Sequence, residues 1–223
     1  MPEETSDRLV VVAPDGARGA GVRVGTQPHA AAVAGGRIFV GDERANTLSV
    51  LAGPRGPVVA TLPVATQPGG VASVASGRAV AVVSVRGRVL ELYDARTLRR
   101  LGRVGAGVGP THVVGDASGA HLYVIDTAGG ALLVYDLRPR LELVRRYALP
   151  GAPYGVALDP VRRRLWVTLT ARNEVVELPA HGRPYALRRL PTVRQPDSLA
   201  VDPATGRVFV TGRDAGTLQI IDP

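Results

Sequence analysis

Short apolar segments alternate with polar turns along the whole chain. Residues 47–51, 90–94 and 218–222 are rich in β-branched and large apolar side chains, and Gly, Asn, Asp or Pro bounds them. This composition and these boundaries are typical of β-strands. No segment combines a 3.6-residue apolar period with helix caps. The pattern therefore predicts an all-β protein.

The same order of segments recurs about every 43 residues. Each unit has a Pro, an apolar segment, a turn with Gly or Asp-Pro, a second apolar segment, a polar loop and a third apolar segment. The prolines are Pro28, Pro68, Pro110, Pro153 and Pro196. Equivalent positions of the third segment are Leu48, Leu90, Leu132, Val175 and Leu218. We expect one domain over residues 1–223, with units at about 25–66, 67–108, 109–151, 152–194 and 195–223.

A four-stranded sheet repeated at this period is typical of a β-propeller blade. One such sheet has two apolar faces, and packing the sheets radially buries both. We therefore predict a propeller of about five four-stranded blades. Residues at one position of the second strand are expected to pack between blades; they are Phe39, Val80, Tyr123, Trp166 and Phe209.

The two ends of the chain suggest how the ring closes. The chain ends three strands into a blade, and segment 19–24 is expected to add the missing outer strand. Segment 8–13 is then surplus, so it either pairs beside the closing strand or belongs to a partly formed sixth blade. In the alternative, the ring stays open and a partner chain closes it, which would make the protein an oligomer.

Segments 195–211 and 217–222 resemble a YVTN-type β-propeller repeat, as do 154–160 and 165–168. The resemblance covers all five units, although the second, 68–94, is degenerate. Similar proteins include YncE-like, lactonase-like and NHL-repeat propellers and the streptogramin lyases, most with six or seven blades. Their roles span ligand binding, surface functions, DNA association and metal-assisted catalysis. The resemblance therefore implies the fold and leaves several functions open.

In such propellers, the loops before the inner strand and those between the second and third strands share one face. The first set is 26–29, 66–69, 108–112, 151–154 and 194–197, and the second is 42–46, 85–88, 126–130, 171–174 and 213–216. Residues near each Pro should then ring the channel mouth and bind a small molecule or a protein; they are His29, Thr111, His112, Tyr154 and Asp197. In the alternative, they only cap turns or hydrogen-bond neighbouring blades.

The expected function is therefore a non-catalytic binding or scaffold propeller without a cofactor. The alternative is a lactonase- or lyase-like enzyme with a divalent metal such as Ca, Mg or Zn on His29, His112 and Asp197, because imidazole and carboxylate suit such ions. Pro28-His29 resembles the Pro-His pairs of streptogramin lyases, although only one unit has it. His121 and His181 are expected to be exposed polar residues.

Arginine recurs in the second loop set, at Arg44, Arg172 and Arg213. A guanidinium pairs bidentately with carboxylate or phosphate, so these residues are candidates for anion binding at the mouth. In the alternative, they form ion pairs between blades with acidic residues of this loop set, namely Glu43, Glu174 or Asp214.

The net charge of +8 comes with no Lys, so all 27 basic residues are Arg, spread along the chain. This looks like the codon bias of a GC-rich bacterial genome, and the even spread argues against nucleic-acid binding. There is no Cys, no apolar run long enough for a membrane span and no signal-peptide pattern. The expected compartment is the cytoplasm, or the periplasm or exterior if an export segment is missing. No phosphate loop, nucleophile elbow or His-Glu-x-x-His motif occurs.

Overall fold

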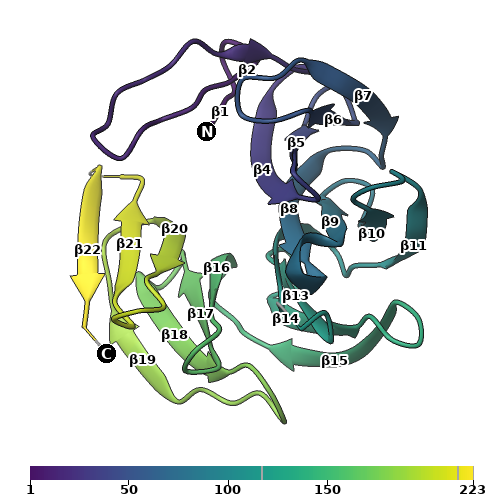
Figure 1. Ribbon diagram of the computed structural model, residues 1–223. Coiled ribbons are helices and arrows are strands. Elements are labelled where there is room, and N and C mark those ends of the chain that lie inside the picture. Colours follow the sequence, from purple (N-terminus) through teal and green to yellow (C-terminus); the bar gives the residue numbers. More distant parts are fainter. Residues whose placement is uncertain (117, 215, 223) are drawn as a thin grey trace.

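The computed structural model describes residues 1–116, 118–214 and 216–222 (Figure 1). Ala117 and Ala215, which fall in a predicted turn and a predicted loop, and Pro223 lie outside these residues. The described residues are all β except for one 3₁₀ turn, η1 (Ala75–Gly77). The predicted all-β class is therefore confirmed, and antiparallel sheets stand around a centre as propeller blades do. The predicted number of five blades is not confirmed, because the described residues form six sheets.

Four of the six sheets within the described residues have four strands in sequence order. Their strands are β4 (Pro28–Ala34), β5 (Arg37–Asp42), β6 (Thr47–Leu51) and β7 (Val58–Pro63); β8 (Pro68–Val74), β9 (Ala79–Ser84), β10 (Val89–Asp94) and β11 (Arg100–Gly105); β12 (Pro110–Gly115), β13 (His121–Asp126), β14 (Ala131–Asp136) and β15 (Glu142–Ala148); and β16 (Pro153–Asp159), β17 (Arg164–Leu169), β18 (Glu174–Pro179) and β19 (Arg188–Pro191). The first strand of each sheet contacts the first strand of the next and lies innermost.

The two end sheets have three strands each. They are β1 (Pro2–Glu3), β2 (Arg8–Leu9) and β3 (Val22–Arg23), and β20 (Pro196–Val201), β21 (Val208–Gly212) and β22 (Thr217–Ile221). In the N-terminal sheet the Asp7 carbonyl accepts from the Val24 N–H at 3.0 Å, just as Asn46 accepts from Val64 at 3.1 Å in the next sheet. The N-terminal sheet thus corresponds to strands two to four of a blade, and the C-terminal sheet to strands one to three.

The predicted ring closure is wrong. Strand β3 pairs with β2, and no strand among the described residues pairs with the outer edge of β22. The reason is packing. Leu9, Val22 and Val24 cover the face of the first four-stranded sheet that is turned away from the second. The alternative of a partly formed sixth blade fits the segment around residues 8–13, and Figure 1 shows the ring open beside β22.

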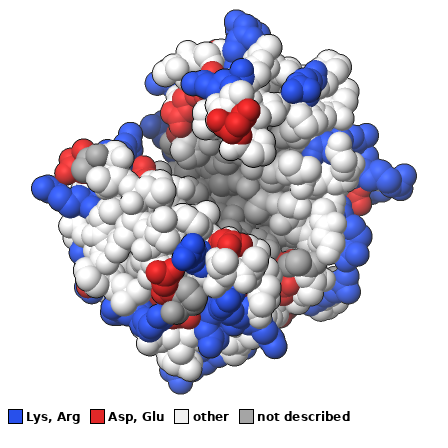
Figure 2. Space-filling model, turned by 60° about the vertical axis from the view of Figure 1, so that its left-hand side comes forward, with Lys and Arg blue, Asp and Glu red and all other residues white. Residues whose placement is uncertain are grey.

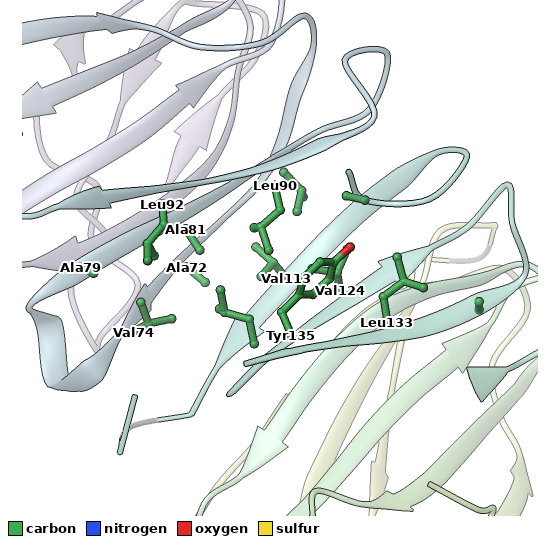
Figure 3. Packing of buried hydrophobic residues seen from close by; sticks show 14 residues of the cluster. Ala72, Val74, Ala79, Ala81, Leu90, Leu92, Val113, Val124, Leu133 and Tyr135 are labelled. Carbon is green, nitrogen blue, oxygen red and sulfur yellow. The ribbon is translucent and has the colours of Figure 1, made fainter. Parts of the chain in front are cut away.

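The core lies between neighbouring sheets, in five clusters for the six sheets. Figure 3 shows one of them, where Leu90 and Leu92 face Val124 and Tyr135 of the following sheet. The inner strands approach closely where one of them has a glycine: a Cβ on Gly115 would overlap the side chain of Val74 in the preceding sheet. Each blade therefore buries its faces against its neighbours, as the repeat predicts.

The prediction that large second-strand side chains pack between blades is confirmed for Phe39, Tyr123 and Trp166, which are buried. Val80 is also buried between two blades, but it packs toward the preceding sheet, so its predicted equivalence to Phe39 is one residue off. Phe39 lies three residues before Asp42, which pairs with Pro28, and Ala81 lies three residues before Ser84, which pairs with Pro68. Ala81, not Val80, is therefore the equivalent, and a slip of one residue places a side chain on the opposite face.

Candidate functional site

The two predicted loop sets meet on one face of the ring. The backbone carbonyl of the residue before each Pro accepts a hydrogen bond, 2.7 to 3.0 Å long, from the backbone N–H of the residue that directly follows the second strand. The pairs are Gln27 with Glu43, Gln67 with Val85, Gly109 with Thr127, Ala152 with Thr170, and Gln195 with Arg213. Each bond joins the two loops within one sheet, and we call the end of the ring that carries these loops the mouth.

A bulge follows each Pro at the start of an inner strand. The register with the second strand shifts at Pro28, Pro68, Pro110, Pro153 and Pro196. Bulges redirect side chains and are common beside functional sites. Here they fall on or next to the residues that sequence analysis placed at the mouth.

The mouth brings together side chains from four different blades. The rings of His29 and His112 have centroids 6.4 Å apart, and His112 meets Tyr154 edge-on at 4.7 Å. Asp197 is close enough to His112 to influence its pKa. Four of the five predicted mouth residues therefore converge, although the first and the last lie 168 positions apart in the chain.

Glycines in the intervening blade make this convergence possible. Strand β8 lies between the strands that carry His29 and His112, and the two residues after Pro68 are glycines without side chains. A Cβ on Gly69 would come within 3.0 Å of the Thr111 carbonyl oxygen, and one on Gly70 within 3.0 Å of the His112 Cα. The second unit thus clears space for the two imidazoles.

Burial dominates the electrostatics of the mouth. It lowers the pKa of His112 to about 4; His29 acts in the same direction, while Asp197 and a hydrogen bond to the Tyr154 backbone oppose it. Burial also raises the pKa of the Tyr154 hydroxyl, and Arg213 counteracts this. At neutral pH both side chains are therefore uncharged. The buried Nδ1 of His112 has no hydrogen-bond partner among the described residues.

Sequence analysis missed Glu4 and considered Glu43 only as an ion-pair partner for an arginine, yet both carboxylates lie at the mouth. His29 Nδ1 lies 2.8 Å from Glu4 Oε1 and 3.8 Å from Glu43 Oε2. Glu43 also accepts from the side-chain amide of Gln67 at 2.6 Å. Glu43 follows the second strand of its blade, and Glu4 follows β1, which corresponds to the second strand of a blade, so the two residues are equivalent. The signal was Asp7-Arg8-Leu9, which parallels Asn46-Thr47-Leu48.

The alternative interpretation of the loop arginines, ion pairs between blades with Glu43, Glu174 or Asp214, is wrong for the described residues. Arg44, Arg172 and Arg213 are exposed and form no ion pair with any described residue. The acidic residues bind elsewhere instead: Glu174 pairs with Arg189 at 3.4 Å and Asp214 with Arg194 at 3.2 Å. The three guanidiniums are therefore free to meet a ligand.

Thr111 takes a structural part in the rim: its hydroxyl lies 2.7 Å from that of Thr127, which donates to the Pro153 carbonyl. A polar groove of about 340 Å³ opens between the first two four-stranded sheets and is lined by Glu43, Arg44, Gln67 and Arg86, among others. The rim is thus polar, with both hydrogen-bonded and free groups.

The mouth residues do not form a ready metal site. Among the described residues, one group of three side chains has its potential ligand atoms within 4.8 Å of one another, and it consists of Asp116, His121 and His181. It lies at the opposite ends of the strands. The metal hypothesis for His29, His112 and Asp197 is therefore not supported by a preformed set of ligand atoms among the described residues.

The charges are distributed around the ring. In Figure 2, Arg and acidic side chains stand on the rim of a hollow whose lining is uncharged, and no single basic patch covers that face. No helix among the described residues has the length and apolar character needed to cross a membrane.

Comparisons with known proteins define the class by fold. A putative 6-phosphogluconolactonase from Bacteroides uniformis is similar with a TM-score of 0.82 and 16% identity, over 100% of this chain and 75% of that one. Streptogramin B lyase is similar with a TM-score of 0.74 and 16% identity, over 99% of this chain and 77% of that one. A chain of the mitotic checkpoint complex is similar with a TM-score of 0.85 and 11% identity, over 97% of this chain and 68% of that one.

The fold is therefore that of propeller proteins, among them lactonase-like and lyase structures. No protein-family model matches the chain, and no curated protein does. The finer resemblance to YVTN and YncE-like repeats thus stays a prediction. At these identities the likeness extends to the fold alone.

Proposed function

We propose that the protein is a ligand-binding propeller whose mouth takes a small, hydroxylated organic acid. The observation that carries the proposal is the buried Nδ1 of His112, which has no partner among the described residues. A buried polar atom without a hydrogen bond costs about 1–3 kcal/mol. A ligand hydroxyl or N–H that reaches this nitrogen would recover that energy.

The surrounding groups favour a ligand with both hydroxyl and anionic parts. Tyr154 and Asp197 adjoin His112 and offer a donor and an acceptor for hydroxyl groups. Arg172 and Arg213 present exposed guanidiniums that form no ion pair with any residue the structure describes, and such groups suit a carboxylate or phosphate. Similarity to putative 6-phosphogluconolactonases, whose name refers to a phosphorylated sugar lactone, supports testing sugar acids first.

The test is a thermal-shift titration with gluconate and 6-phosphogluconate, with glucose as the uncharged control. A bound ligand raises the melting temperature by mass action. We expect the acids to raise it and glucose to do so less, and we expect His112→Ala and Arg213→Ala to reduce the shift. Arg140→Ala is the matched control, because this exposed side chain pairs with Glu142 beside an outer strand. An equal shift in wild type and His112→Ala would contradict the proposal.

A second candidate is a metal-assisted lactonase or lyase. Its support is the position of His29 between Glu4 and Glu43, together with the similarity to streptogramin B lyase. The corresponding assay is hydrolysis of gluconolactone with and without added Mg²⁺, Ca²⁺ or Zn²⁺. Turnover that needs both the metal and His29 would favour this candidate, whereas binding without turnover would favour the first.

A further inference from the structure

A second cluster of chemically active side chains lies on the face opposite the mouth. Asp116 follows the last residue of β12, His121 is the first residue of β13, and His181 lies just beyond the end of β18. Strand β12 begins at the mouth with Pro110, so its other end and these residues lie on the far face. Sequence analysis expected both histidines to be merely exposed polar residues.

The three ligand atoms point at one another. Asp116 Oδ2 lies 3.8 Å from His121 Nδ1 and 3.9 Å from His181 Nε2, and all three atoms are within 4.8 Å. A tetrahedral ion with bonds of about 2.1 Å holds its ligands roughly 3.4 Å apart. Small side-chain movements would therefore bring the three atoms to coordination distance.

The hydrogen-bond pattern leaves the ligand atoms free. The other carboxylate oxygen of Asp116 accepts from the Ser118 N–H at 2.5 Å, so Oδ2 is available. The Nδ1 of His121 is buried and has no partner among the described residues. Its Nε2 faces Asp136 Oδ1 at 3.2 Å. Asp136 Oδ1 is also buried and has no hydrogen-bond partner among the described residues, so it is available to accept a proton from Nε2. A metal on Nδ1 would place the His121 proton on Nε2, where Asp136 could orient the ring.

The surrounding backbone holds the cluster in place. The Asp116 N–H donates to the His121 carbonyl at 3.0 Å, which closes the turn that carries both residues. The loop that carries His181 is attached to the neighbouring blade, since Tyr123 donates to the Ala180 carbonyl and Arg145 to the Gly182 carbonyl. The ligands thus come from two blades whose contact is already fixed.

We propose that Asp116, His121 and His181 form a binding site for a divalent transition metal of the zinc type, which links the third and fourth four-stranded blades on the face opposite the mouth. Two imidazole nitrogens and one carboxylate oxygen are the donors that such ions prefer, and they leave a fourth position for water. Asp136 orients His121 and does not itself bind the ion.

One neighbour works against the metal. The guanidinium of Arg163 donates through Nε to His181 Nδ1 at 3.3 Å. Metal on Nε2 requires the proton on Nδ1, so this contact must break, and the cation also repels the ion. Replacing Arg163 should therefore strengthen binding, a result that a purely structural cluster would not give.

The test is calorimetric titration of Zn²⁺ into the full, untagged and chelator-treated chain. We expect one equivalent to bind and the melting temperature to rise. His121→Ala and His181→Ala should each weaken binding at least tenfold, Asp136→Asn should weaken it about tenfold, and Arg163→Ala should strengthen it. The chain has four histidines, so His29→Ala and His112→Ala are matched controls that should leave zinc affinity unchanged.

His181 is exposed in a loop, so His181→Ala should fold even if His121→Ala does not. With Co²⁺, a visible absorption band lost in His181→Ala would confirm imidazole coordination. The proposal is overturned if no saturable binding occurs, or if affinity in His181→Ala equals that of the wild type. Binding lost only in the two mouth variants would also overturn it, and would assign the metal to the mouth instead.

Discussion

Protonation of His112 should destabilise the folded protein as the pH falls. Burial holds the pKa of this imidazole at about 4, against an ordinary value of 6.5. In the unfolded chain the ring meets water and takes up its proton near pH 6.5. The folded state resists protonation until about pH 4, so over this range the unfolded state binds more protons.

The sign and size of the effect follow from this difference. A lowered histidine pKa leaves stability complete above about pH 6.5 and removes it progressively as the pH falls towards 4. One pKa unit corresponds to about 1.4 kcal/mol, so the shift from 6.5 to about 4 amounts to about 3 kcal/mol in all. At about pH 5, roughly 2 kcal/mol of this should already be lost.

The assay is urea unfolding of the wild type and His112→Gln at about pH 7 and about pH 5. The emission of Trp166 reports the transition, because it is the only tryptophan of the chain and is buried between two blades. We expect the wild type to lose about 2 kcal/mol more than the variant between these two conditions. Other groups titrate in both proteins, so their contributions cancel in the comparison. A difference below about 0.5 kcal/mol would refute the reasoning about burial.

The remaining predictions concern stability and association. Asp126 accepts three backbone N–H groups at 2.8 to 3.1 Å, so Asp126→Ala should lower the free energy of unfolding by about 3 kcal/mol or more, and Asp126→Asn by less. Tyr135→Phe removes a 2.8 Å hydrogen bond to the Gly105 carbonyl and should cost about 1 kcal/mol by urea unfolding. Leu218→Thr and Ile220→Thr change side chains that are 58% and 54% exposed, so each should alter stability by less than about 0.5 kcal/mol. If the open edge of β22 pairs with other chains, sedimentation should show less self-association of these two variants than of the wild type. Equal self-association of variants and wild type would argue that this edge stays unpaired.

Much of the mouth could be predicted from the repeat. The period places His29, Thr111, Tyr154 and Asp197 at equivalent steps near the start of successive inner strands, and such positions must share one face. Glu4 was missed because its sheet has no first strand among the described residues and so no Pro that marks a unit; only the parallel between Asp7-Arg8-Leu9 and Asn46-Thr47-Leu48 points to it.

The cluster on the far face was beyond the sequence for a different reason. Asp116 and His121 come from one blade and His181 from the next, 60 residues further on. The spacing matches no metal-binding motif, since the ligands are joined by packing between blades and not by one local segment. Whether such groups meet depends on the contact between two sheets.

The sequence by itself determined the strands, the turns and the period, because these depend on the alternation of side chains and on Gly and Pro in each unit. Only the tertiary structure decided which sheet the N-terminal segment joins. There Leu9 covers the apolar face of the first four-stranded sheet around Val40, and β22 has no outer partner strand in the described part of the chain. Both choices would satisfy the backbone hydrogen bonds of a short strand. Side-chain burial against a particular neighbour selects between them, and that burial exists only once the blades have packed.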